Sequence, residues 1–148
     1  MTHAELVKIA ERWLVSARGC GAVLTELVTL YPEIPDAIGF RDGTTTLLEC
    51  KASRADFLAD AKKIFRRNPW MGMGTFRLYL CPTGIITPED LPPKWGLIWV
   101  NEKGKARMQV GPKGNCWSSR HQEFFFGEKN VEAEQAILVS AVRRYQGR

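Results

Sequence analysis

The chain has 148 residues, of which 45% are hydrophobic and 25% are charged, a composition typical of a globular protein. This length predicts a single domain, residues 1–148, that folds without a disulfide or a structural metal. The sequence contains no apolar run near the roughly 20 residues that a membrane-spanning helix needs, so we expect no membrane partner. The first residues are amphipathic and lack a signal-peptide core, which favours a cytoplasmic location.

The formal charge of +5 is unevenly distributed along the chain. Residues 1–60 hold nine acidic residues against six Lys and Arg, whereas residues 61–148 hold seven acidic residues against fifteen Lys and Arg. A protein that presents metal-binding carboxylates to a polyanion would show this asymmetry. A basic protein with an ordinary solvated surface would show it too, so charge alone leaves both interpretations open.

The four cysteines lie about thirty residues apart, with no Cys-x-x-Cys pair. Zinc sites and disulfide frameworks use tighter spacings, so we expect buried free thiols. We also expect no small-molecule cofactor. The cysteines are Cys20, Cys50, Cys81 and Cys116.

A first helix is predicted over residues 2–17, with Thr2 as N-cap and Glu5 completing a capping box. Residues 20–29 follow as an apolar, strand-forming run that contains Glu26. A lone carboxylate buried in such a run costs several kcal/mol unless a cation compensates it. Glu26 is therefore either a site residue or a solvent-facing residue at the edge of a sheet.

Two further strands are predicted next, joined by a tight turn at residues 41–44. Asp36 opens the first of them, residues 36–40, and the second covers residues 44–51. Side chains alternate along a strand. The alternation places Leu47, Glu49 and Lys51 on one face and Leu48 and Cys50 on the other.

A second helix is predicted after Ser53, its N-cap, and is expected to end before Asn68-Pro69. Its C-terminal half is basic, which suits the helix dipole and would also suit contact with phosphates. The predicted buried stripe is Phe57, Leu58, Ala61, Ile64 and Phe65, and the basic residues are Lys62, Lys63, Arg66 and Arg67.

The rest of the chain predicts strands over residues 76–82, 96–100 and 106–110, and a last helix capped by Asn130. Residues 111–127 mix basic and aromatic side chains, which is compatible with base stacking or with an aromatic plug over a sheet edge. The mixed segment includes Lys113, Trp117, Arg120, His121 and Phe124 to Phe126, and the apolar face of the last helix is Ile137, Leu138, Ala141, Val142 and Tyr145.

The spacing of Asp36, Glu49 and Lys51 is compatible with a metal-dependent phosphodiesterase. Mg²⁺ prefers oxygen ligands, which Asp36, Glu49 and the backbone carbonyl of Cys50 would supply, and Mn²⁺ would serve as well. Glu26 would add a carboxylate or accept a proton, and Lys51 would hold the phosphate or orient the attacking water. A Glu-x-Lys triplet occurs often by chance, so salt-bridged strand residues are the competing interpretation.

The order helix, strand, strand with Asp, strand with Glu-x-Lys, helix, strand resembles the PD-(D/E)XK nuclease superfamily, which has the restriction-endonuclease-like fold. Here the signature is Pro35-Asp36 and Glu49-Cys50-Lys51, and the sequence SRADF at residues 53–57 is similar to the MmcB-type DNA repair proteins. The resemblance covers about residues 20–110. It implies an α/β fold whose central mixed sheet is flanked by helices, with an α-β-β-β-α-β core.

By this resemblance Asp36 and Glu49 would be metal ligands, Lys51 the catalytic lysine and Glu26 an additional acid. Arg54 and Asp56 would be motif residues of the following helix. The basic end of that helix, apart from the resemblance, adds Lys62, Lys63, Arg66 and Arg67 to Arg54 as predicted DNA-binding residues.

We therefore expect a Mg²⁺- or Mn²⁺-dependent DNA endonuclease that is selective for DNA structure and acts in repair or recombination. Cutting both strands would call for a homodimer. The alternatives are a non-catalytic nucleic-acid-binding module on the same fold and an ordinary α/β protein whose charges form salt bridges.

Overall fold

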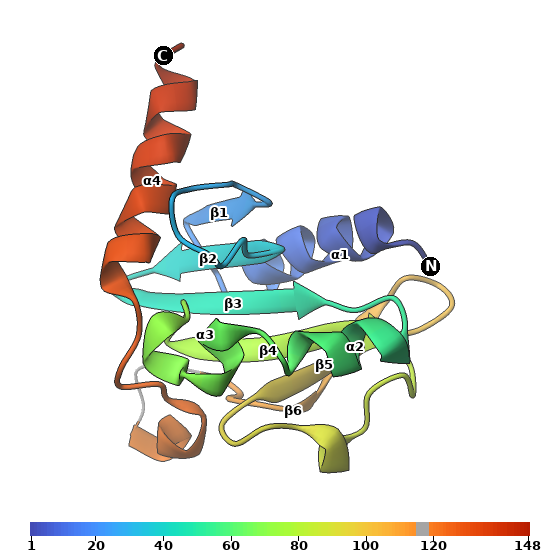
Figure 1. Cartoon of the computed structure of the whole chain (residues 1–148). Helices are drawn as coiled ribbons and strands as arrows, with labels where there is room; N and C mark the ends of the chain where they lie inside the picture. The colour runs from blue at the N-terminus through green and yellow to red at the C-terminus, as the bar shows by residue number, and fades with distance from the viewer. Residues whose placement is uncertain (115–118) are drawn as a thin grey trace.

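The computed structural model describes residues 1–114 and 119–148 and forms one mixed sheet whose six strands lie in chain order (Figure 1). β3 and β4 are parallel, as are β4 and β5, while the other three neighbouring pairs are antiparallel. The predicted α/β class and the order α-β-β-β-α-β are confirmed. The strands are β1 (Ala22–Thr25), β2 (Ala37–Arg41), β3 (Thr44–Cys50), β4 (Phe76–Pro82), β5 (Gly96–Val100) and β6 (Ala106–Val110).

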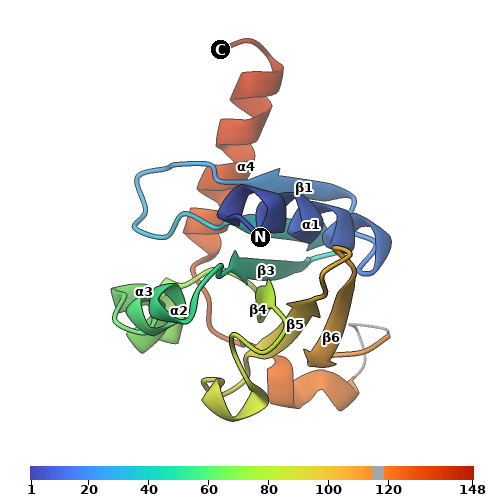
Figure 2. The ribbon, with the colours of Figure 1, turned by 90° about the vertical axis from the view of Figure 1, so that its right-hand side faces the viewer.

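Helices cover both faces of this sheet (Figure 2). Helix α1 (His3–Ser16) lies on one face, and α2 (Arg54–Asp60) with α3 (Ile64–Arg67) lies on the other, where they form the crossover between β3 and β4. Helix α4 (Val131–Tyr145) packs at the end of the sheet where β3 begins (Figure 1). The structure also contains short 3₁₀ helices at Pro69–Met71, Pro88–Asp90 and Ser119–Phe124.

The first helix forms as its sequence predicts. Thr2 and Glu5 make both hydrogen bonds of the capping box. The apolar face then packs against the sheet, and burial of large aliphatic and aromatic side chains contributes about 1.5–3 kcal/mol each. The buried residues are Leu6, Val7, Ile9, Ala10, Trp13 and Leu14.

The predicted alternation along β3 is also confirmed. Leu48 and Cys50 belong to the core between the sheet and α1, whereas Leu47 packs with Phe57 of α2 and Tyr79 of β4 on the opposite face. Glu49 therefore points to the α2 side, because it shares the face of Leu47. This fixes which layer of the molecule surrounds the candidate carboxylate.

The sequence had predicted one continuous second helix. In the structure this helix breaks between Asp60 and Ile64. Only Phe57 and Phe65 of the predicted apolar stripe are buried, and Asp60 is buried with them. On an unbroken helix Asp60 and Arg66 would point about 120° apart. Because the helix breaks, the two side chains can form an ion pair with each other, in which Arg66 Nε lies 2.8 Å from Asp60 Oδ2.

The predicted apolar face of the last helix is wrong in its second half. The buried residues of α4 are Ala133, Glu134 and Ile137, while Val142 and Tyr145 are exposed. The reason is visible in Figure 1: the C-terminal half of α4 extends beyond β1, so no strand covers it.

Cys50 and Cys81 are free and buried as predicted, Cys20 is buried, and Cys116 lies outside the described residues. Trp117 lies outside them as well. Phe126 packs in the core beside Trp95, which agrees with an aromatic plug for that part of residues 111–127. Within the described residues, no helix has the length and apolar character needed to cross a bilayer.

A substitution at Gly39 would test how tightly α1 packs against the sheet. A Cβ at Gly39 would lie 2.5 Å from Cys20 Sγ, which is too close, and 3.3 Å from Leu14 Cδ2, which is a tight contact. Gly39→Ala should lower the free energy of unfolding by about 1–3 kcal/mol through overpacking, measured by urea denaturation. Gly21→Ala is the control, since a Cβ there meets nothing within 4 Å and should change stability by less than about 0.5 kcal/mol. Equal effects at the two glycines would contradict this packing.

Candidate functional site

The predicted acidic residues come together at one end of three neighbouring strands. Strand pairing aligns Thr25 with Ala37 and Ala37 with Leu48. The next row across the sheet therefore contains Glu26, Asp36 and Glu49. Two hydrogen bonds hold this row: Glu26 N–H donates to the Pro35 carbonyl at 3.0 Å, and Cys50 N–H donates to Asp36 Oδ2 at 2.8 Å.

Glu26 lies just after β1 rather than within the strand, which corrects the predicted range of residues 20–29. Its φ of 52° is left-handed, and its side chain is 52% exposed. Glu26 therefore carries no buried, uncompensated charge. It faces the site from its solvent side.

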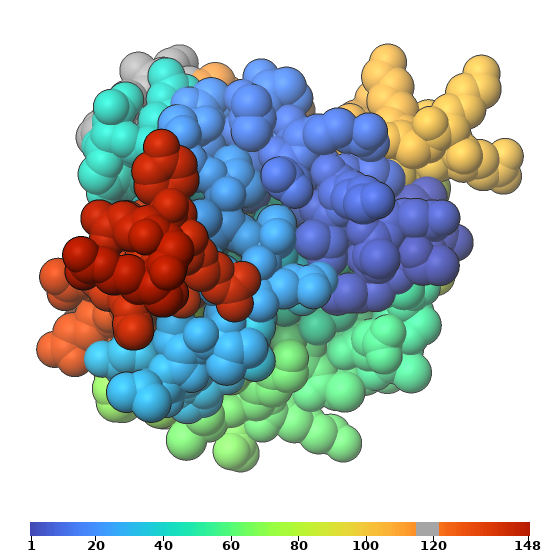
Figure 3. Space-filling model, turned by 90° about the horizontal axis from the view of Figure 1, so that it is seen from above, coloured from blue at the N-terminus to red at the C-terminus, as the bar shows by residue number. Residues whose placement is uncertain are grey.

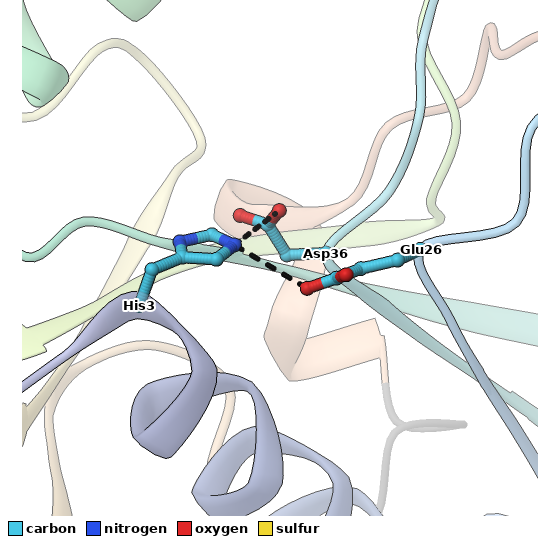
Figure 4. A group of neighbouring side chains, drawn as sticks. All are labelled: His3, Glu26 and Asp36. Atoms are coloured by element: carbon cyan, nitrogen blue, oxygen red, sulfur yellow. Dashed lines mark ion pairs between the residues drawn. The ribbon is translucent and has the colours of Figure 1, made fainter.

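His3 lies between the carboxylates of Glu26 and Asp36, as Figure 4 shows. Its Nε2 atom is 3.4 Å from Glu26 Oε1 and 3.3 Å from Asp36 Oδ1. Sequence reasoning missed His3. The capping box at Thr2 places His3 in the first turn of α1, but nothing local in the sequence shows which strand ends that turn faces.

The Asp36 side chain is only 15% exposed. Burial raises the pKa of Asp36, while the hydrogen bond from Cys50 and the neighbouring His3 oppose this rise. The N–H and C=O of one residue in an extended strand point to the same neighbouring strand. The Cys50 carbonyl therefore faces the Asp36 side, where the sequence had predicted an oxygen ligand.

Glu49 is buried, with 4% of its side chain exposed. Oε1 lies 3.2 Å from Arg66 Nη2 and Oε2 lies 3.6 Å from Lys51 Nζ. Among the described residues, however, no group is aligned to hydrogen-bond Glu49 Oε1. Burial raises the pKa of Glu49 to about 8, against the lowering effect of Arg66, and nearby Asp36 raises it further. Glu49 is thus a carboxylate that lacks part of the compensation its charge requires.

Lys51 is buried between two carboxylates, since its Nζ atom also lies 3.2 Å from Asp60 Oδ1. Asp60 is fully buried, and its Oδ2 accepts hydrogen bonds from Tyr79 at 2.7 Å and from Arg66 at 2.8 Å. Burial alone would raise the pKa of Asp60, but Arg66 and Lys51 lower it to about 2. Asp60 is therefore a permanent anion that holds Lys51 beside Glu49, a role that the sequence had not predicted.

Arg66 is the centre of this ion network. Its guanidinium pairs with Glu33, Glu49 and Asp60, and only 4% of its side chain is exposed. It also lies over the Trp95 ring at 4.8 Å. The guanidinium of Arg66, which was predicted to bind nucleic acid, is therefore buried among carboxylates of the protein itself.

The other predicted DNA-binding residues lie nearer the surface. Arg54 makes two hydrogen bonds of 2.9 Å to Asp90, so its guanidinium is already occupied by a carboxylate. Lys63 is half exposed and lies 3.2 Å from Asp60 Oδ1. Lys62 and Arg67 are exposed. Lys63 therefore offers an exposed ammonium group beside the ion network to an anionic partner.

His3, Glu26 and Asp36 form a group that could hold a metal ion. One ligand atom each from His3, Glu26 and Asp36 lies within 4.8 Å of the others. Glu49 lies in the same row across the strands but is not a member of this group. Carboxylate and carbonyl oxygens are the ligands that Mg²⁺ uses in proteins.

Comparison with protein-family models, with curated proteins and with solved structures gives no match for this chain. The resemblance to the PD-(D/E)XK superfamily therefore stays a prediction from the motif.

Proposed function

We propose that the protein is a metal-dependent nuclease of the restriction-endonuclease-like fold that hydrolyses phosphodiester bonds in DNA. The observation that carries the proposal is the convergence of Asp36, Glu49 and Lys51 at the same end of β2 and β3, where the Cys50 N–H donates to Asp36. These are the positions at which the motif predicts two metal ligands and a lysine. We further propose a role in DNA repair or recombination.

Asp36 and Glu49, with the Cys50 carbonyl, would hold Mg²⁺ or Mn²⁺. The bound cation would neutralise phosphate charge and supply a hydroxide nucleophile at neutral pH. Lys51, 3.6 Å from Glu49 Oε2, would stabilise negative charge on the reacting phosphate. Asp60 is a positioning residue, because it fixes Lys51 without reaching the substrate. Since Lys51 is buried here, substrate binding has to open the surface above it.

The exposed cations support a polyanionic substrate. Lys63 is half exposed and lies 3.2 Å from Asp60 Oδ1, so it places positive charge beside this buried carboxylate, and Lys62 and Arg67 are exposed. Contacts of this kind bind phosphate groups without reading sequence, and the affinity falls as salt concentration rises. This arrangement is compatible with selection of DNA by structure.

The decisive experiment uses labelled DNA duplexes, single strands, nicks, flaps and junctions with Mg²⁺ or Mn²⁺, comparing wild type with Lys51→Met. Methionine keeps the aliphatic bulk of the lysine. We expect wild type to cleave at least one of these forms, and Lys51→Met to lose about 100-fold or more of that activity while still binding DNA. Lys8→Met, on the exposed surface of α1, is the control and should cleave normally.

Melting curves of all three proteins show whether each variant is folded. Binding without cleavage by wild type would overturn the nuclease proposal in favour of a non-catalytic nucleic-acid-binding module. If wild type neither binds nor cleaves DNA, the result would favour an α/β protein whose charged residues form only structural ion pairs.

A further inference from the structure

A groove lies between α4 and the segment that joins β1 to β2, away from the candidate site. Its volume is about 790 Å³. Val28 and Leu30 line one wall, and Ala136 and Val139 line the other. Figure 3 shows α4, in red, standing beside this segment, in light blue.

The groove exposes more apolar surface than scattered single residues would. Leu30 is fully exposed, Val28 is 65% exposed and Val139 is 50% exposed. On the neighbouring side of α4, Leu138 and Val142 are exposed as well. A contiguous apolar surface of this kind on a soluble domain marks an interaction site.

The groove side of α4 has a regular pattern. Its lining residues recur at helical spacing, so they form one stripe along the helix. Ala136 and Ser140 are small, which permits close approach of another helix. Glu132 lies at one end of the stripe and Arg143 at the other. Within the part of the chain that the structure describes, Arg143 makes no ion pair, so its charge is free for a partner.

We propose that two copies of this chain associate through this groove, with their α4 helices antiparallel across a two-fold axis. A surface that is acidic at one end, apolar in the middle and basic at the other end is complementary to itself in this orientation. Pairing Glu132 with Arg143 of the second copy brings Val139 over Ala136 of that copy. Such an isologous arrangement is the commonest way for identical chains to form a closed dimer.

The interface leaves the candidate site uncovered. Thr45, at the start of β3, hydrogen-bonds Glu134 of α4 at 2.9 Å, whereas Glu49 lies near the other end of that strand. The two regions are thus at opposite ends of the sheet (Figure 1). The dimer does not depend on the proposed nuclease activity, and each can fail without the other.

The first test is the mass of the full chain in solution, measured by sedimentation velocity over a series of protein concentrations. Wild type should be a dimer whose fraction rises with concentration. Val139→Glu should shift the protein to monomer by placing a charge in the centre of the interface. Val15→Glu is the matched control, since Val15 is an exposed apolar residue (55%) on α1, and it should leave the dimer unchanged.

The second test is charge reversal at the ends of the stripe. Arg143→Glu should raise the dissociation constant by about 10-fold or more, because two acidic side chains would then face each other. Glu132→Arg should do the same, although it also removes the 3.3 Å hydrogen bond from Tyr31. The double variant should recover most of the wild-type affinity. A wild type that stays monomeric at every concentration, or a Val139→Glu variant that still dimerises, would overturn the proposal.

Discussion

Glu49→Gln is expected to reduce Mg²⁺-dependent DNA cleavage by about 100- to 1000-fold or more and, without metal, to increase the stability of the folded protein. Glutamine keeps the shape of Glu49 but supplies one neutral oxygen in place of a carboxylate. It would therefore bind the cation weakly and compensate phosphate charge poorly. Loss of activity with gain of stability is the pattern of a residue retained for function at the expense of folding.

The expected gain in stability follows from the raised pKa of Glu49, about 8 in the folded protein because of burial. The unfolded chain loses this proton near its ordinary pKa of about 4.5, whereas the folded chain keeps it until about pH 8. The contribution of the protonated Glu49 carboxyl group to the free energy of unfolding is therefore complete below the pKa of the unfolded chain. It is lost as the pH rises through the pKa of the folded protein. At pH 9, without metal, Glu49→Gln should therefore be more stable than wild type by about 1 kcal/mol or more.

Urea denaturation at pH 9 in EDTA measures this difference, and Glu11→Gln on the exposed surface of α1 is the control. Adding Mg²⁺ should raise the stability of wild type, since a ligand that binds only the folded state stabilises it, and should not raise that of Glu49→Gln. A variant less stable than wild type at pH 9, with no response of either protein to Mg²⁺, would show that Glu49 serves as a structural ion-pair partner.

The alignment of Asp36 with Glu49 was predictable because it depends on short-range rules. A tight turn at residues 41–44 sets the pairing of two adjacent strands, and side-chain alternation sets the face. The structure confirms both, since Ala37 pairs with Leu48 and Glu49 shares the face of Leu47. The capping boundary of α1 at Thr2 was predictable for the same reason.

The partners of the site were not predictable, because they come from distant segments. His3, Glu33 and Asp60 reach the site from α1, from the β1–β2 segment and from α2. One signal was present in the sequence: Asp60 follows the buried Phe57 at a spacing of three residues, which places a carboxylate on the buried face of the helix. The periodicity of the apolar residues gave no signal for the break after Asp60, which accompanies ion pairs of Asp60 with the distant Lys51 and with Arg66.

Arg66→Ala is expected to lower the free energy of unfolding by about 3–5 kcal/mol at neutral pH, the cost of removing one partner from a buried ion pair. Arg66 pairs with three buried acidic groups, Glu33, Glu49 and Asp60, and its removal would leave their negative charge with less compensation. The variant also loses the stacking of the guanidinium on Trp95. Urea denaturation measures the effect, with Arg67→Ala as control.

Arg67 is the neighbouring arginine and is exposed, so its removal should change stability by less than about 0.5 kcal/mol. The double variant Glu33→Gln with Arg66→Ala should lose less stability than the two single losses together, because neutralising one carboxylate relieves part of the repulsion. Strict additivity, or equal effects of Arg66→Ala and Arg67→Ala, would mean that the carboxylates are compensated by other groups. In that case Lys51 and Lys63, which both contact Asp60, would carry the compensation.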